Sequence, residues 1–271
     1  MTAAAPRQQR RRIEREQIKS GRTLLATGLP PTPKREAMRD IARALKAKLI
    51  ERDNPLRAGE AAAITQNLFE ASLKRYPARV EIACKKGCTY CCHGFVGAVP
   101  PEIFRIAHTL SSRMPSGLTR ADISAKATLL GSMSPAARVG AKLACPLLID
   151  NACSTYGERP LVCRQATSLM LPACIEEFEG HYGASDKIEV SSAHLTHAGN
   201  AHVALLGAML SADLPTTAYE FASSLDVALS LPDAESRWLA GEEIFRSCKN
   251  PVERQPLIDQ VAAKIAADLD A

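Results

Sequence analysis

Four cysteines within nine residues, Cys84, Cys88, Cys91 and Cys92, are the part of the sequence best suited to chemistry. A thiolate is the metal-binding form of cysteine, and several bare thiolates this close would repel one another unless a cation compensated their charge. The Cys88-x2-Cys91 spacing is that of a metal-binding knuckle, and Gly87 permits the tight turn that such a knuckle needs. Because neighbouring side chains of an extended chain point apart, Cys91 and Cys92 are not expected to serve one ion together.

A second group of cysteines follows farther along the chain, Cys145, Cys153 and Cys163. The Asp150-Asn151 pair between apolar flanks suits a tight hairpin turn, which would carry Cys145 and Cys153 toward the same end of a two-stranded ribbon. Cys163 supplies a third thiol after a turn at Arg159-Pro160. Each group lacks a complete set of four well-separated ligands, so we expect the two groups to converge, with sulfur atoms about 4 Å apart.

Charged and polar neighbours accompany both groups. A zinc ion held by four thiolates carries net negative charge, which nearby cations offset. The basic residues placed for this role are Lys85, Lys86, Arg159 and Arg164. His93 follows Cys92 directly, and we interpret it as a neighbour of the ligands rather than a ligand.

Two further cysteines are interpreted differently. Cys248 is isolated in a C-terminal helical segment, where a small buried hydrophobic residue is the simplest interpretation. Cys174 lies beyond the second group, and both interpretations, metal ligand and packed core residue, stay open for it.

The two-part pattern is Cys84-x3-Cys88-x2-Cys91-Cys92, then Cys145-Pro146 and Cys153-x2-Tyr156-x2-Arg159-Pro160-x2-Cys163-Arg164. It resembles the YkgJ-type cysteine-cluster proteins over about residues 80 to 175. The resemblance implies chelation of zinc or iron, with an iron–sulfur cluster as a further alternative, and it implies no reaction, so catalytic residues stay unknown. The metal ligands that it implies are Cys84, Cys88, Cys91, Cys92, Cys145, Cys153 and Cys163.

Helices are expected on both sides of the cysteine motifs. Apolar residues at three- and four-residue steps predict helices over about 34–53 and 58–75, joined as a hairpin. Alternation over 79–83 predicts a short strand that delivers the chain to Cys84, and 96–99 is a second extended piece. The segment 145–174 is rich in turn formers and is expected to be a loop-and-hairpin region. The remaining helices are expected over about 102–113, 118–131, 192–212, 216–229, 233–248 and 251–269.

The fold class that follows is mainly α, with a small irregular α+β cysteine-rich insert that binds metal. Aromatic residues make up only 4% of the 271 residues, so the core must be built from Ala, Leu, Ile and Val, which favours closely packed helices. The expected division of the chain is a basic mobile tail (1–33), a helical hairpin (34–78), the cysteine-cluster domain (79–184) and a C-terminal helical region packed on it (185–271).

Charge and hydropathy indicate where in the cell the protein is expected. Residues 1–36 contain nine Lys or Arg against three Glu, so they carry the whole of the formal net charge of +5, and the remainder is about neutral. No apolar run approaches the ~20 residues of a membrane span, and no export signal is apparent. We therefore expect a cytoplasmic protein without membrane contact, where cysteines stay reduced and free for metals.

Besides a metal ion, the expected partner is a protein that docks on the C-terminal helices. Two alternative functions stay open. One is a radical S-adenosylmethionine-type iron–sulfur enzyme, because Cys84-x3-Cys88-x-Tyr90-Cys91 reproduces a three-cysteine pattern of that class; it would require a repeating strand–helix barrel, which the sequence does not predict. The other is a zinc-stabilised nucleic-acid-binding module that uses the basic tail, which the few aromatic residues do not favour.

Overall fold

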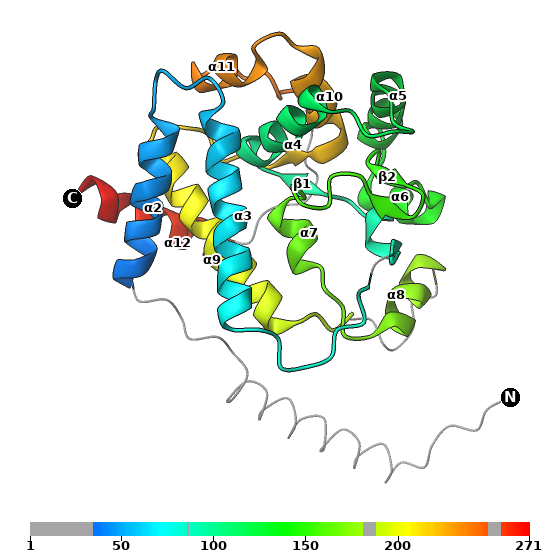
Figure 1. Ribbon diagram of the computed structural model, residues 1–271. Helices are drawn as coiled ribbons and strands as arrows, with labels where there is room; N and C mark the ends of the chain where they lie inside the picture. Colours follow the sequence, from blue (N-terminus) through cyan, green and yellow to red (C-terminus); the bar gives the residue numbers. More distant parts are fainter. Residues whose placement is uncertain (1–34, 86, 181–187, 249–255) are drawn as a thin grey trace, which may run out of the picture.

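The computed structural model describes residues 35–85, 87–180, 188–248 and 256–271, and their secondary structure is mainly helical (Figure 1), as the sequence predicts. The helices are α2 (Arg35–Leu49), α3 (Arg57–Arg75), the 3₁₀ helix η1 (Tyr90–His93), α4 (Pro100–Ser112), α5 (Arg120–Gly131), α6 (Pro135–Ala141), α7 (Leu161–Gln165), α8 (Leu171–Phe178), α9 (Ser192–Ser211), α10 (Phe221–Ser230), α11 (Ala234–Leu239) and α12 (Pro256–Asp270). The expected tail over 1–33, Lys86 and the expected domain boundary at 184 lie outside the described residues. In the described part of the chain, no helix is long and apolar enough to cross a bilayer.

Helix α9 runs through the middle of a helical body and contacts α2, α3, α7 and α12 (Figure 1). Its inner residues are small or aliphatic, and Ala201, Ala204 and Leu205 are all buried. The helices approach closely: at Gly207 a Cβ atom would lie only 2.6 Å from Cγ2 of Ile265 on α12. Such close contact explains how a chain with few aromatic residues fills its core, since little side-chain volume is needed between the helices.

Helix α4 connects this body to the cysteine-bearing part of the chain. It begins with two prolines, which are tolerated there because the first turn of a helix needs no backbone donor. On its inner face Phe104 packs against Trp238 and Phe245, with ring centroids 5.7 and 5.6 Å apart. Contacts with α3 and α10 complete its burial, so α4 gives the cysteine-bearing segments a rigid support.

The strands are short and pair antiparallel in twos: β1 (Gly97–Ala98) with β4 (Tyr219–Glu220), and β2 (Leu148–Ile149) with β3 (Ala152–Cys153). The β2–β3 pair is the predicted hairpin. Its turn residues Asp150 and Asn151 have φ values of 46° and 57°, the left-handed conformation that a two-residue hairpin turn requires.

Several expected elements differ in the structure. The strand expected over 79–83 is irregular chain, held by a 2.9 Å hydrogen bond from Ala83 N to Ser168 O. The helix expected over 233–248 is only α11, because the chain turns at Gly241 with φ of 90°. Residues 216–220 are not helical, since β4 precedes α10. The region expected to be loop and hairpin also contains the short helices α7 and α8.

Candidate metal centre

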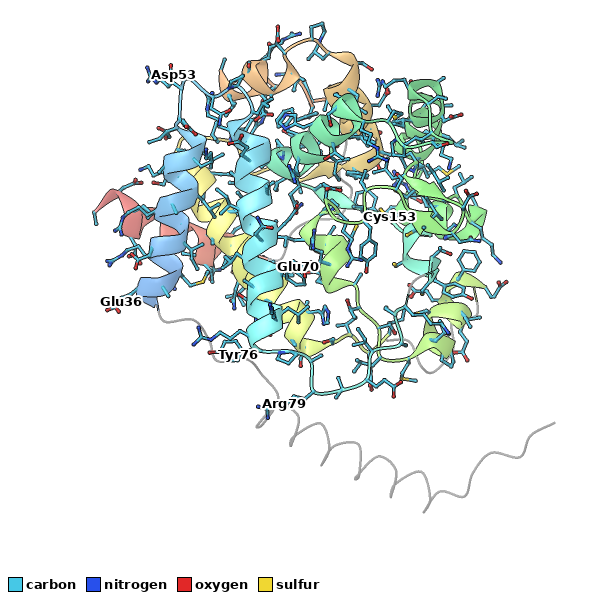
Figure 2. The ribbon with its side chains drawn as sticks, viewed as in Figure 1. Glu36, Asp53, Glu70, Tyr76, Arg79 and Cys153 are labelled. Carbon is cyan, nitrogen blue, oxygen red and sulfur yellow. The ribbon has the colours of Figure 1, made fainter. Side chains whose placement is uncertain are left out.

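A cavity of about 730 Å³ lies among η1, α7, α8 and the β2–β3 hairpin, the region where Cys153 is labelled in Figure 2. Side chains from the two predicted groups of cysteines line it together. The seven cysteines at the cavity wall are Cys88, Cys91, Cys92, Cys145, Cys153, Cys163 and Cys174. Apart from Cys84, treated below, the cavity therefore gathers all the ligands that the sequence predicts, and it adds Cys174.

The first group of cysteines is placed by a tight turn and η1. Gly87 has φ of 90°, and the Cys88 N–H closes the turn by donating to the carbonyl three residues earlier at 3.0 Å. The Cys92 N–H then donates to Thr89 O at 2.9 Å, which begins the 3₁₀ helix. Since a 3₁₀ helix has about 3 residues per turn, the neighbouring side chains of Cys91 and Cys92 leave it in different directions.

A backbone hydrogen bond ties the second group to the first. The Cys145 N–H donates to Cys92 O at 2.8 Å, although more than fifty positions separate the two residues in the sequence. The β2–β3 hairpin then returns the chain so that Cys153 faces the cavity beside Cys145. The two groups thus line one cavity, as their ligand counts predict, whereas sulfur spacings of about 4 Å stay a prediction.

Cys163 is held in place by two buried polar side chains from other elements. Glu102, on α4, accepts a hydrogen bond from the Leu161 N–H at 2.7 Å and so fixes the start of α7. Arg164, only 3% exposed, donates to the Glu70 carboxylate of α3 and to Gly157 O. The short helix that carries Cys163 is therefore anchored to both α3 and α4 (Glu70 is labelled in Figure 2).

Ser168 connects the remaining two cysteines of the cluster. Its backbone N–H donates to Cys84 Sγ at 3.2 Å. Its side chain is hydrogen-bonded to Cys174, at the wall of the cavity on α8. Cys84 is thus beside the cavity, next to Cys174, although these two residues are far apart in the sequence.

Removal from water raises the pKa of two thiols in the second group, Cys145 and Cys163. Burial raises the pKa of Cys145 to about 12 and holds that of Cys163 well above its usual range, with the charges of neighbouring thiols adding to the effect. Both thiols are therefore protonated at neutral pH in the absence of a cation. A bound metal ion would displace these protons, so metal binding at this cavity releases protons.

The adjacent thiols Cys91 and Cys92 share a hydrogen bond that shifts their pKa values in opposite directions. Cys91 accepts this bond, which lowers its pKa to about 7. Cys92 donates the bond, and the pKa of Cys92 is raised by that donation and by burial. Of this adjacent pair, Cys91 is therefore the thiol that more readily supplies a thiolate to an incoming cation.

The donor set fits a thiophilic metal. Soft thiolate ligands favour zinc or iron–sulfur clusters over magnesium or calcium, and eight free cysteines gather at or beside the cavity. Among the residues that the structure describes, no three His, Cys, Asp or Glu side chains already stand at coordinating positions. The thiols are therefore close neighbours around one space, and their side chains must turn to complete a coordination shell.

The structure also shows the surroundings of Cys248 and His93, which the sequence analysis sets apart from the ligands. Cys248 is 2% exposed in the main core, which agrees with a packing role. His93 has its Nδ1 3.1 Å from Thr89 O, and its ring lies edge-on to Phe178 with centroids 4.8 Å apart. The His93 ring thus braces η1 against α8 at the cavity wall.

Sequence reasoning did not identify three residues that shape this site. Both interpretations of Cys174 stay open in the sequence, because a segment rich in turn formers gives no indication of helix α8. Glu102 lies in the first turn of α4, and nothing in its sequence context indicates the bond to Leu161. Ser168 has no motif around it.

Comparison with known proteins agrees with this geometry. Residues 83–187 match the family model CxxCxxCC, described as "Putative zinc- or iron-chelating domain". The match covers a little over a third of the chain and includes every cysteine at the cavity. No curated protein and no solved structure matches the chain. The predicted resemblance to a metal-chelating cysteine-cluster family is thus confirmed for this segment, and the cofactor class is zinc or iron.

Proposed function

We propose that the protein chelates zinc or iron through the cysteines that the sequence predicts. The observation that carries the proposal is the gathering of thiols from three separate segments around one cavity. Two of these segments are joined by the bond between Cys145 and Cys92. The proposed ligands are Cys84, Cys88, Cys91, Cys92, Cys145, Cys153 and Cys163.

The metal decides what the site contributes. Zinc in an all-thiolate site supplies folding energy, whereas an iron–sulfur cluster supplies a one-electron couple. The chain's own residues hold the ligands in either case: Glu102 and Arg164 fix α7, and Ser168 donates to Cys84. We propose no reaction and no catalytic residue.

Localisation and partners belong to the same proposal. Thiols kept free for a metal fit the reducing cytoplasm. A protein partner at the C-terminal helices and nucleic acid at the basic tail stay predictions. A radical S-adenosylmethionine enzyme is not favoured, because the strands of the described residues pair only as two short antiparallel ribbons.

Elemental analysis of anaerobically purified protein, with its visible spectrum, tests the proposal. Colourless protein with zinc supports a structural site, and brown protein with iron supports an iron–sulfur cluster. Cys153→Ser should lower the metal content and Cys248→Ala should not. Metal-free protein that also fails to take up added zinc or ferrous iron would contradict the proposal.

A further inference from the structure

We infer that the cavity also binds a small organic anion, an aromatic ring that carries a carboxylate, beside the cysteines. This goes beyond metal chelation, because the residues that would hold the ligand are not cysteines. The volume of the cavity, about 730 Å³, is within the range of about 300–1,000 Å³ that encloses small organic ligands. Zinc held by thiolates lies about 2.3 Å from each sulfur, so it fills only a small part of this volume.

The cavity extends from the surface to the main core. Three side chains that line it are buried, Ile106, Leu147 and Phe221. Two others that line it lie at the surface, since Lys85 is exposed and the exposed fraction of Tyr156 is 61%. An apolar inner end takes the body of a ligand out of water, and a charged group on the ligand then stays near the mouth.

Aromatic side chains are concentrated at this cavity. The chain has only six Phe, five Tyr and one Trp, and five of these line the cavity: Tyr90, Phe95, Tyr156, Phe178 and Phe221. The rings of Tyr90 and Phe178 lie edge to face, with centroids 5.5 Å apart. Coordination by thiolates needs no ring, whereas a planar ligand gains from stacked and edge-on contacts with such side chains. The body of the ligand is therefore an aromatic ring.

Arg159 provides the group that recognises the carboxylate. Its guanidinium carbon lies 3.7 Å from the centre of the Tyr156 ring, so the guanidinium is stacked on that ring. Its Nε is buried and has no hydrogen-bond partner among the residues that the structure describes. A carboxylate would accept from Nε and from a terminal nitrogen together, in the two-bond arrangement that arginine favours.

The charge of the described cavity wall also favours an anion. The wall carries two cations, Lys85 and Arg159, against the single carboxylate of Glu177. A thiolate of the metal site is the alternative acceptor for Arg159, and the experiment below separates the two acceptors.

Calorimetric titration of the zinc-loaded, full-length chain with two probes tests the inference. The probes are 2-naphthoate and 2-naphthamide, which share the same rings and differ in charge. The wild type should bind 2-naphthoate about 10- to 100-fold more tightly, as a hydrogen bond to a charged group provides. Arg159→Gln should remove this difference, and its control, Arg113→Gln, should keep it because Arg113 is exposed and does not line the cavity.

The aromatic wall is tested in the same titrations. Phe178→Leu should weaken the binding of both probes about 3- to 10-fold, because an apolar side chain stays but the ring contact is lost. Tyr76→Leu is the control, since Tyr76 lies outside the cavity. Hydrogen exchange on the unmutated chain guards against variants that do not fold: 2-naphthoate should slow amide exchange in η1, α7 and α8 and leave α12 unchanged.

Three results would overturn the inference. They are no binding of 2-naphthoate at about 1 mM, equal affinity of the wild type for the two probes, and an Arg159→Gln variant that changes zinc retention but keeps the ratio of the two affinities. The last result would mean that Arg159 serves only the thiolates. Zinc measured in every sample separates this inference from the proposed function: bound zinc without 2-naphthoate binding contradicts the inference alone. Selective 2-naphthoate binding by a chain that takes up no metal supports the inference and contradicts metal chelation.

Discussion

The helical body and the cysteine-bearing segments are held together by different means. Helix α9 alone buries eleven residues, most of them Ala, Leu, Val or Met. Between Glu70 and Gly97, by contrast, no described residue is fully buried. The first cysteine segment is held at polar points such as the bond from Cys145 N to Cys92 O. The second segment also buries Leu147 in the main core and Leu161 against Phe69.

This contrast indicates where each part obtains its stability. Burial of apolar surface contributes about 25 cal/mol per Å², so the body can fold from its own side chains. The first cysteine segment buries too little to offset the entropy of ordering an irregular chain, and the second buries only a few residues such as Leu147 and Leu161. We therefore expect the body to be stable without metal and the cysteine segments to depend on it.

The largest effect should come from removing a metal ligand. Structural zinc contributes on the order of 10 kcal/mol, which is comparable to the whole stability of a domain. Cys88→Ser and Cys153→Ser should therefore release metal and expose the cysteine-bearing segments 79–97 and 145–174 to protease, whereas α9 and its neighbours, α4 included, keep their helical circular dichroism.

Limited proteolysis with and without a chelator measures this difference. Cys248→Ala is the control, because Cys248 is buried in the main core and does not line the cavity. Protease resistance in Cys88→Ser equal to that of the wild type would show that the cysteine segments are stable without the metal.

A core substitution in the body should produce the opposite pattern. Leu205 is 0% exposed on α9, and Leu205→Ala should lower the free energy of unfolding by about 2–5 kcal/mol through lost burial and the cavity left behind. Metal content should not change. Denaturant unfolding followed by circular dichroism measures the loss. Leu257→Ala is the matched control, since Leu257 is 65% exposed on α12 and the same change there should have little effect.

Glu102, on α4 of the helical body, binds the start of α7 in the cysteine-bearing part of the chain. Its removal should therefore affect the metal site more than the helical body. Glu102→Ala leaves the buried N–H of Leu161 without a partner, which costs about 1–3 kcal/mol. Because this bond fixes the start of α7, the change should weaken metal binding about 10- to 100-fold, as removal of a group that orients a ligand does.

Zinc competition with a chelator and thermal unfolding measure the two effects of Glu102→Ala separately. Glu36→Ala is the control, because Glu36 also stands in the first turn of a helix but is exposed and far along the chain from any cysteine. Unchanged zinc affinity in Glu102→Ala would mean that α7 does not need this bond.

The fold and the ligands differ in how far the sequence predicts them. Helix α2 follows from apolar periodicity, because it buries one face, which carries Ala42, Leu45 and Leu49. The β2–β3 hairpin follows from its turn residues, which accept left-handed backbone angles. Cysteine spacing is enough to indicate a metal site, since close thiolates need a cation.

The contacts that orient the ligands could not be predicted. Helices α7 and α8 are too short for periodicity to reveal, and they depend on bonds such as Glu102 to Leu161 and Arg164 to Glu70. These partners lie at least 59 positions apart in the sequence. The amino-acid sequence alone does not predict these hydrogen-bond partners, because they meet only when the helices pack together.

The smallest effect should come from deleting residues 1–33. The segment carries seven Lys or Arg against two Glu, has three prolines in its last four positions and shows almost no apolar periodicity. Such a chain buries too little apolar surface to offset its ordering entropy, so we expect it to add to neither region. The deletion variant should keep the wild-type metal content and a melting temperature within about 4 °C of the wild type. Scanning calorimetry and elemental analysis measure both. A loss of metal, or a melting temperature lower by more than about 4 to 8 °C, the change that roughly 1 kcal/mol produces in a small domain, would show that the basic segment stabilises the body or the metal centre.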